Sequence, residues 1–321
     1  MLGKTAIAFA TQQATQATIS FTRKPEIEIH SAFSKGKSWS IDEALEIYTR
    51  IKKRHSSFVD GHLSIEHVMR DPSHLVLSSI AQFFDTHECQ QGCRIDISSN
   101  IPLGSGMGSS ASVIVACLKA LHILFDEPIK DNLFLAEANA IEALQHGKTK
   151  GLDVAQSYYG DWLNMFQDAS KHIQIHPFKP SFIPSLLAVH TGQPEVSTGE
   201  CVQHVLKQHG NDASLWSESN QIAQTWLTLL QTANHKNNNE NKNQTAIQLI
   251  QQNHQLLTKI GVVPGQVSEF ISDVEKRGGA AKISGAGAYQ GHAAGMVLAT
   301  GISENSLQDL CSLYHYKQLS A

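Results

Sequence analysis

The sequence lacks a long apolar run, and this absence excludes a membrane-spanning helix of ordinary length. No uninterrupted apolar stretch approaches the roughly 20 residues that cross a bilayer. The amino terminus, MLGKTAIAFATQQ, has no long apolar segment followed by a small-residue cleavage site. We therefore expect a cytoplasmic protein with no membrane partner.

Charge is also sparse and nearly balanced. Charged residues make up 17% of the chain, and the formal net charge is −4 with histidine neutral. This balance does not favour a nucleic-acid partner or an anionic membrane surface. Apolar residues make up 41% of the 321 residues, which is typical of a globular protein with two domains or one large one.

Cysteine is scarce. The five cysteines stand at positions 89, 93, 117, 201 and 311. An odd number at irregular spacing does not indicate a disulfide framework and favours a reducing compartment. His87, Cys89 and Cys93 lie close in sequence, but C-x3-C without a second ligand pair is weak evidence for zinc. We interpret these as scattered cysteines.

The hydrophobic pattern mixes strands and helices without strict alternation, which favours an α+β fold. Strands are predicted within 5–29 and at 94–98, 185–190, 280–284 and 291–299. Helices are predicted at 41–53, 72–86, 110–125, 131–146, 195–207, 212–232, 245–260 and 266–277. The polar stretch HKNNNENKNQ, residues 235–244, is predicted to be a flexible surface loop. We place a domain boundary near residue 180.

The most informative stretch is IPLGSGMGSSA, residues 101–111, which joins a predicted strand to a nearly all-apolar helix. Glycine accepts a positive φ and lets a ligand approach the backbone closely. The amides of such a turn, together with the helix amino terminus, form an anion site. The alternative is a tight structural turn with a serine cap, but the serine pair at the helix start favours phosphate.

Two other nucleotide motifs do not fit the sequence. Gly3-Lys4-Thr5 and Gly147-Lys148-Thr149 both end as a P-loop does, but neither has the required glycine five positions upstream. A dinucleotide fingerprint requires G-x-G-x-x-G, whereas the glycines here run G-x-G-x-G before the serines. NAD binding is therefore a weak alternative.

Glu142 and Asp153 are candidate acids for phosphoryl transfer. They stand eleven residues apart, one in a predicted helix and one in the segment that follows it. Transfer to an alcohol requires a metal to neutralise the phosphates and benefits from a carboxylate near the attacking hydroxyl. From spacing alone, two ordinary surface acids are the better interpretation.

At this point the chain resembles a known family. IPLGSGMGSSAS is similar to the nucleotide motif P-x-G-x-G-L-G-S-S-A of the GHMP kinases, with methionine in place of leucine. The resemblance implies that the turn holds ATP and that Ser110 also reaches Mg²⁺. The implied ATP-binding residues are Gly104, Ser105, Gly106, Met107, Gly108, Ser109 and Ser110.

The acid pair resembles E-x-x-x-H-G-x-P-S-G-x-D of the mevalonate kinases, with the same spacing from glutamate to aspartate. This likeness implies that Glu142 is a Mg²⁺ ligand and that Asp153 is the catalytic base or orients the hydroxyl. The chain departs from the motif at Thr149 and Lys150, where the family has proline and serine. The departure adds a cation beside the implied site.

The carboxy-terminal half resembles the family in two further places. Residues 281–287, AKISGAG, are similar to the third motif K-x-T/S-G-A-G-G-G-G, although Ala288-Tyr289-Gln290 replace its later glycines. The resemblance implies substrate contacts from Ser284, Gly285 and Ala286. The stretch LLAVHTGQPEVST is similar to a family segment that ends in a substrate-side threonine, here Thr198. A helix-capping threonine is an equal alternative for Thr198.

The resemblance implies an α+β, two-domain GHMP kinase fold. Residues 1–180 would form an ATP-binding α/β domain with a mixed sheet, and residues 181–321 a ferredoxin-like α/β domain. The implied function is ATP-dependent phosphorylation of the primary hydroxyl of mevalonate in a possible homodimer. The alternatives are a kinase for a sugar or for phosphomevalonate, and a truncated or non-catalytic nucleotide-binding homologue.

The family begins with a strand that carries P-G-K and then G-E-H. Here Gly3-Lys4-Thr5-Ala6-Ile7-Ala8 fits a later G-x-P-A-I-A stretch better, so the first strand is expected to be absent. A phosphate-stabilising lysine would be lost with it, at roughly 10²–10³ in rate. One hypothesis is that Lys150 partly replaces that lysine.

Overall fold

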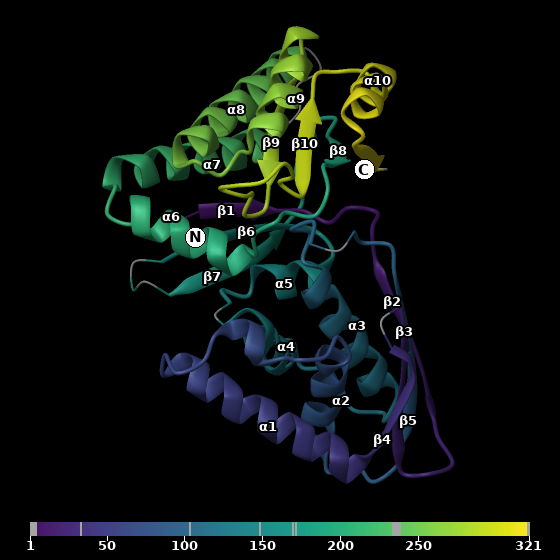
Figure 1. Cartoon of the computed structure of the whole chain (residues 1–321). Helices are drawn as coiled ribbons and strands as arrows, with labels where there is room; N and C mark the ends of the chain where they lie inside the picture. Colours follow the sequence, from purple (N-terminus) through teal and green to yellow (C-terminus); the bar gives the residue numbers. More distant parts are fainter. Residues whose placement is uncertain are drawn as a thin grey trace. The chain divides into compact units, whose positions relative to one another are not determined.

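The computed structural model describes residues 5–32, 34–102, 104–147, 149–168, 170, 172–232 and 239–319 (Figure 1). Their contacts group the chain into two units. Unit 1 comprises Met1–Gln12, Pro102–Met107 and Gly160–Ala321, and unit 2 comprises Gln13–Ile101 and Gly108–Tyr159. Gly3 and Lys4, on which the placement of the amino terminus depends, lie outside the described residues.

Unit 2 contains a four-stranded mixed sheet. Its strands are β2 (Thr15–Phe21), β3 (Glu26–Ser31), β4 (Ser34–Ser40) and β5 (Cys93–Ser99). Their order is β2-β5-β3-β4, in which β3 runs parallel to β5 and the other neighbours are antiparallel. Ile27, Ile29 and Ile95 point into the core of this unit and are fully buried.

The helices of unit 2 complete this core. They are α1 (Ile41–Val59), α2 (His74–His87), α3 (Ser109–Leu124), α4 (Asp131–His146) and α5 (Leu152–Tyr159), with a 3-10 turn η1 at Ile65–His67. Helix α3 packs against β2, α2, α4 and α5. This central position explains why α3 is apolar on most sides, since a helix in contact with neighbours all round buries most of its surface.

Unit 1 contains two antiparallel sheets. The first has the order β1-β6-β7, from β1 (Thr5–Ala8), β6 (Trp162–Gln167) and β7 (Ile173–Phe178). The second has the order β11-β8-β10-β9, from β8 (Leu187–His190), β9 (Ala280–Ser284), β10 (Met296–Thr300) and β11 (Lys317–Leu319).

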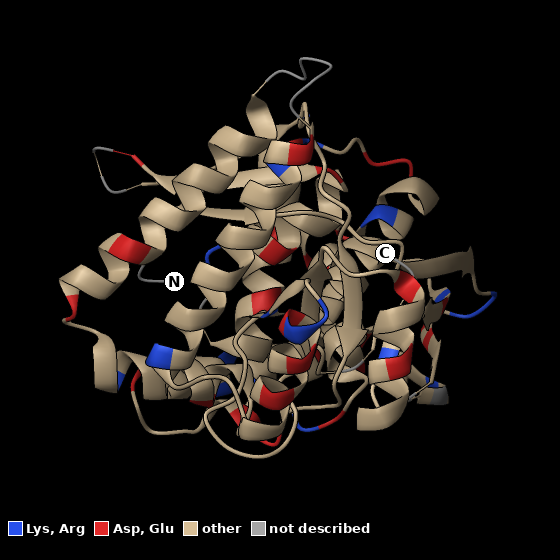
Figure 2. Cartoon of the chain, turned by 90° about the horizontal axis from the view of Figure 1, so that it is seen from above, with Lys and Arg blue, Asp and Glu red and all other residues tan. Residues whose placement is uncertain are grey.

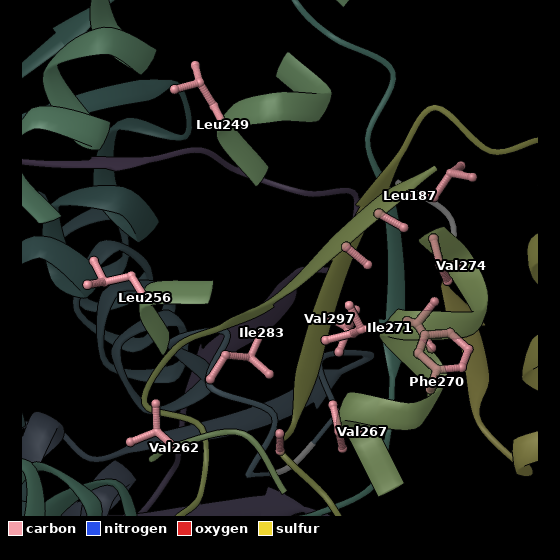
Figure 3. Close-up of a cluster of buried hydrophobic side chains, with 14 of the residues drawn as sticks. Leu187, Leu249, Leu256, Val262, Val267, Phe270, Ile271, Val274, Ile283 and Val297 are labelled. Atoms are coloured by element: carbon pink, nitrogen blue, oxygen red, sulfur yellow. The ribbon is translucent and has the colours of Figure 1, made fainter. Parts of the chain in front are cut away.

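Among the described residues of unit 1, five helices accompany these sheets. They are α6 (Thr198–His209), α7 (Ala213–Gln231), α8 (Asn239–Ile260), α9 (Gly265–Lys276) and α10 (Glu304–Tyr314). Helices α8 and α9 pack on β9, and the core between them contains Phe270, Ile271 and Ile283 (Figure 3). Burial of such side chains stabilises this part of the chain by about 1.5–3 kcal/mol each.

Most predicted elements are confirmed, but one is wrong. The polar segment 235–244 was predicted to be a loop, whereas α8 already begins at Asn239; residues 235–238 lie outside the described residues. Lys242 explains part of the difference, because its side chain is only 4% exposed and its Nζ donates to Thr232 O at 2.8 Å. The same ammonium group lies 5.3 Å from the centre of the Phe182 ring.

The domain boundary near residue 180 stays a prediction. The contacts group residues 160–180 with the residues that follow them, and they add two short segments from earlier in the chain. One of these contains β1, which pairs with β6, and the other contains Ser105, whose carbonyl accepts a hydrogen bond from the Met296 amide at 3.1 Å. The units are therefore assembled from discontinuous segments.

Charged residues of both signs are interspersed along the chain (Figure 2). In unit 2 Lys37 Nζ lies 2.6 Å from Asp71 Oδ2, and this contact with Lys37 holds the pKa of Asp71 well below its usual range. Among the described helices, none combines the length and the apolar character that a bilayer crossing requires.

Candidate active site

The glycine-rich turn has the backbone conformation that its sequence predicts. Gly104, Gly106 and Gly108 have φ angles of +64°, +76° and +64°. These lie in the left-handed region, where a side chain is strained and glycine is not. Three closely spaced left-handed residues turn the chain sharply between β5 and α3. The alternation of glycines is therefore a conformational requirement of this turn.

Helix α3 begins directly after the turn. Gly108 is its N-cap and provides no side-chain cap, so no side chain of that residue occupies the first amides of the helix. The first four amides of a helix have no partner inside the helix, and its dipole places partial positive charge there. Ser109 and Ser110 occupy the first two helical positions. This helix end is suited to an anion such as a phosphate.

Ser110 is joined to helix α4 by side-chain hydrogen bonds. Its Oγ donates to Glu142 Oε1 at 2.8 Å and lies 3.0 Å from His146 Nε2. His146 Nε2 is in turn 3.5 Å from Glu142 Oε1. Glu142 and His146 share a face because they are four residues apart on α4. The structure thus brings together the two predicted metal ligands, Ser110 and Glu142.

Glu142 is buried, with only 3% of its surface exposed. The pKa of its carboxyl group is raised to about 7, chiefly by burial and to a smaller extent by the charge of Asp153, while the hydrogen bond from Ser110 opposes the shift. Its second oxygen, Oε2, is buried and has no hydrogen-bond partner among the described residues. A buried carboxylate oxygen without a partner is costly unless a cation or donor satisfies it.

These atoms fit a magnesium ion. A carboxylate and a hydroxyl are the hard oxygen ligands that Mg²⁺ binds, and this ion commonly uses one or two protein carboxylates together with phosphate oxygens. Within the described ranges, no three or more histidine, cysteine, aspartate or glutamate side chains gather as a metal site. A magnesium site here would therefore depend on oxygens of the nucleotide as well as on Ser110 and Glu142.

Asp153 lies in the first turn of helix α5 and not in a loop. The sequence placed it in a segment after α4, but Leu152–Tyr159 is helical. The Asp153 side chain is exposed, although surrounding protein displaces enough water to raise its pKa. A Cβ atom added to Gly108 would lie 3.4 Å from Asp153 Cβ. The candidate base therefore stands beside the N-cap of α3.

Sequence reasoning gave no role to two further residues of α4, His146 and Asn139. His146 contacts both Ser110 and Glu142, and its burial lowers its pKa. Asn139 lies one turn before Glu142, and its buried Oδ1 has no partner among the described residues. The available signal was helical spacing, since positions 139, 142 and 146 recur on one face of α4.

The remaining predicted site residues lie in unit 1. A Cβ atom on Gly106 would lie 3.4 Å from Gly285 Cα, so the glycine-rich turn and the third motif approach backbone to backbone. Within unit 1 the structure thus brings Gly106 together with Ser284 and Gly285. A Cβ atom on Gly285 would be crowded, at 3.3 Å from Gly106 Cα, whereas one on Gly106 would make only an ordinary contact. At Gly106 the φ of +76° is what favours glycine.

Thr198 is the first residue of α6 and is exposed. The N-cap is the preceding Ser197, whose Oγ accepts from the Glu200 amide at 3.2 Å. The capping alternative proposed for Thr198 is therefore wrong by one residue. Its role at the substrate stays a prediction. Lys150 is also exposed, directly before Gly151.

Comparisons with known proteins match both the fold and the segment that contains the glycine-rich turn. Residues 74–161 match the model of the GHMP kinases N terminal domain. A solved mevalonate kinase structure superposes with a TM-score of 0.76 at 20% identity, covering 99% of this chain and 91% of that one. Residues 74–161 are therefore similar to the GHMP kinase N-terminal domain, and the chain has the two-domain, α+β fold of the GHMP kinases.

The chain is similar in sequence to several mevalonate kinases. The chain is 30% identical to "Mevalonate kinase" of Archaeoglobus fulgidus over 61% of its length, and 29% identical to that of Pyrococcus abyssi over 61%. The matched parts span 63% and 57% of those relatives, under two thirds of their length. The predicted likeness to the GHMP kinases, and among them to mevalonate kinases, is confirmed.

Proposed function

We propose that the chain transfers the γ-phosphoryl group of ATP to the primary hydroxyl of mevalonate and so forms 5-phosphomevalonate. The observation that carries the proposal is the hydrogen bond from Ser110 Oγ to the buried Glu142 at the amino terminus of α3, with Asp153 beside Gly108. This arrangement offers an anion site, a metal-ligand pair and a candidate base in one unit. The similarity to named mevalonate kinases supports the choice of substrate.

The nucleotide would bind along residues 104–110. Backbone amides of the turn and of the first helical residues would donate to the phosphates, and the hydroxyls of Ser109 and Ser110 would add to them. Met107, which replaces the family's leucine, is half-buried and packs beside Met296. It would contribute its backbone to the turn and its side chain to packing.

Ser110 and Glu142 would hold the magnesium ion. Bound there, the ion supplies neutralisation of charge on the phosphates during transfer. The chain's own contribution is to fix the two oxygen ligands before the nucleotide arrives. His146 helps because its Nε2 lies 3.0 Å from Ser110 Oγ and limits the rotation of that hydroxyl.

Asp153 would orient the acceptor hydroxyl and take its proton. The new bond forms between the hydroxyl oxygen and the γ-phosphorus while the bond from that phosphorus to the bridging oxygen of ADP breaks. A raised pKa makes the Asp153 carboxylate a better proton acceptor than an ordinary aspartate. Thr198, Ser284, Gly285 and Ala286 would contact the acceptor.

A second candidate acceptor carries a phosphate of its own. Lys150 is exposed and adjoins the segment that leads into α5, where the resembled motif has serine. A lysine there would pair with a second anionic group on the acceptor. This observation favours phosphomevalonate or a sugar phosphate as the alternative. A nucleotide-binding protein without turnover is the third possibility.

ADP release from a panel of alcohols tests these proposals. The panel contains mevalonate, phosphomevalonate, a sugar and homoserine, each with ATP and Mg²⁺. We expect release with mevalonate and loss of it in Asp153→Asn, which keeps the size of the side chain but not its basicity. Turnover of only another alcohol would replace the substrate, and nucleotide binding without any turnover would support the non-catalytic alternative.

We also propose a homodimer, which the likeness to the family suggests. Light scattering distinguishes this from a monomer of 35.1 kDa. A monomeric mass at working concentration would end that part of the proposal.

A further inference from the structure

Helix α6 and the segment of residues 284–291, here called the 284–291 turn, are in direct contact within unit 1. Cys201, which is 1% exposed, lies on α6 with its Sγ 3.2 Å from Ala286 O. One turn further along the helix, the His204 ring stacks on Tyr289, with ring centres 4.2 Å apart and planes 8° from parallel. The two contacts lie on the same side of α6 because their positions differ by three.

Tyr289 is unusual for its surroundings. It follows Ser284-Gly285-Ala286-Gly287-Ala288, a run of small residues with positive φ at Gly285 and Gly287. Such a run has little side-chain surface with which to fix its own conformation, and glycine adds backbone freedom. Tyr289 carries the one large ring in the turn and is therefore the residue best able to pack the turn against a neighbouring element.

The stack of His204 on Tyr289 is not needed to fill the hydrophobic core. The stack borders a surface hollow of about 650 Å³ that opens to solvent. The hollow is lined by Glu200, Gln203, His204, Leu206, Lys207 and Tyr289. His204 and Tyr289 are each only partly buried. A pair of rings at the edge of the core contributes to local order more than to the stability of the whole unit.

The far end of the turn also contacts the segment before α6. A Cβ atom on Gly291 would lie 2.7 Å from the Glu195 carboxyl carbon, so the two segments already touch. Ala286, Tyr289 and Gly291 thus each meet α6 or the residues that lead into it. The turn is held at its middle and at its end.

We infer that His204 and Tyr289 are positioning residues: their stack fixes the 284–291 turn against α6 and so sets the distance between Thr198 and the Ser284–Ala286 backbone. If these residues meet the acceptor, the stack determines which alcohol fits. This second step rests on the proposed function, whereas the first concerns the turn alone. Neither ring needs to touch the reacting atoms.

Amide hydrogen exchange tests the first step without any activity. In His204→Ala, we expect exchange in peptides that cover 284–291 to be about 3- to 10-fold faster than in wild type, as loss of one aromatic pair predicts. His204→Phe keeps an aromatic ring and should restore wild-type exchange. The matched control is His176→Ala, which removes a histidine stacked on Phe166 at 5.6 Å between β6 and β7.

Steady-state kinetics tests the second step. His204→Ala should raise KM for the acceptor about threefold or more, leave KM for ATP within about twofold, and be rescued by His204→Phe. Wild-type exchange in His204→Ala would overturn the inference. Faster exchange with an unchanged acceptor KM would confine it to local order. If wild type turns over no alcohol, the proposed function fails, and exchange still decides whether the stack holds the turn.

Discussion

At the scale of single residues, the hydrogen bond between Ser110 and Glu142 is the contact on which most of the chemistry depends. It joins the first turn of α3 to the last turn of α4, and it supplies a donor to a carboxyl group that is 3% exposed. Leaving a buried carboxyl group without its hydrogen-bond donor lowers the free energy of unfolding by about 1–3 kcal/mol. The bond therefore serves both the local structure and the proposed metal site.

Ser110→Ala should lower the unfolding free energy by about 1–2 kcal/mol and turnover by about 10²-fold. The stability loss arises from the unsatisfied Glu142, and the turnover loss from a displaced ligand. Urea denaturation and ADP release measure the two effects. Ser110→Thr is the control, because it keeps a hydroxyl at the same position. Equal losses in both variants would show that the hydroxyl is not the cause.

Glu137 provides a prediction about pH. This residue of α4 is 12% exposed, and its Oε2 lies 4.0 Å from His122 Nε2. Burial raises the pKa of Glu137 to about 7, and burial lowers the pKa of His122. Burial, followed by the charges of Asp85 and Glu137, raises the pKa of Tyr48. The His87 ring centre lies 5.6 Å from that of His122.

The sign follows from which state keeps the proton. The folded state holds the Glu137 proton up to about pH 7, while the unfolded state releases it near 4.5, so stability falls as pH rises through this window. Glu137→Gln removes the titrating carboxyl group and therefore this loss of stability at higher pH. We expect it to be more stable than wild type by on the order of 2–3 kcal/mol near pH 8, and by much less near pH 5.

Urea midpoints at the two pH values test this. His122 is present in both proteins, so its own titration cancels to a first approximation in the difference. A stability difference that does not change between the two pH values would show that the folded carboxyl group titrates normally.

At the scale of helices and strands, the elements that the sequence predicts best are those with local signals. Helix α1 begins after Ser40 because Ser40 and Glu43 form a reciprocal capping box. Helix α7 begins after Asp212, whose side chain accepts from the Leu215 amide. Helix α4 ends at Gly147, which has a φ of +82°. Each boundary is set by residues within four positions of it.

The elements that the sequence missed depend on distant partners. Strand β4, SKGKSWS, has few apolar residues and is a strand because it pairs with β3. Helix α5 has eight residues, too short for a clear period, and packs against α3 and α4. The start of α8 is polar, yet Lys242 is buried. Local composition cannot report such tertiary contacts.

The features of the candidate site likewise divide into those that the sequence indicated and those that depend on tertiary packing. Resemblance to family motifs predicted roles for Ser110, Glu142 and Asp153, and the structure brings Ser110 Oγ and Glu142 Oε1 to 2.8 Å. Spacing did not indicate that Asp153 begins a helix, nor that His146 contacts Ser110. Both depend on how α4 and α5 pack against α3, which no local pattern reports.

Gly108 gives a prediction for the junction between the turn and α3. Gly108→Ala should cost about 1–2 kcal/mol because φ is +64°, and should also reduce turnover because the new Cβ contacts Asp153. Gly160→Ala is the matched control: its φ is +65°, but nothing lies within 4 Å of the added atom. We expect the two variants to lose similar amounts of stability. Turnover should stay near normal only in Gly160→Ala. Equal turnover in the two variants would remove Asp153 from the explanation.

At the scale of the whole molecule, the chain contains two large buried clusters. One contains Leu118 of α3 with the sheet of unit 2, and the other contains Ile271 of α9 with β9 and β10 in unit 1. Both side chains are fully buried. The segments of each unit are discontinuous in sequence, so a core, and not chain continuity, defines each one.

If each cluster stabilises its own unit, a substitution that creates a cavity in one cluster should destabilise only that unit. Ile271→Ala and Leu118→Ala should each cost about 2–5 kcal/mol in the unit concerned. Hydrogen exchange should then accelerate in peptides of α9 and β9 for the first variant, and of α3 and β5 for the second, because cooperative units open separately when their stabilities differ. Ile271→Val is the milder control, with about 0.5–1.5 kcal/mol expected. Uniform acceleration across all these peptides in both variants would show a single unfolding unit, and the division by contacts would then have no energetic counterpart.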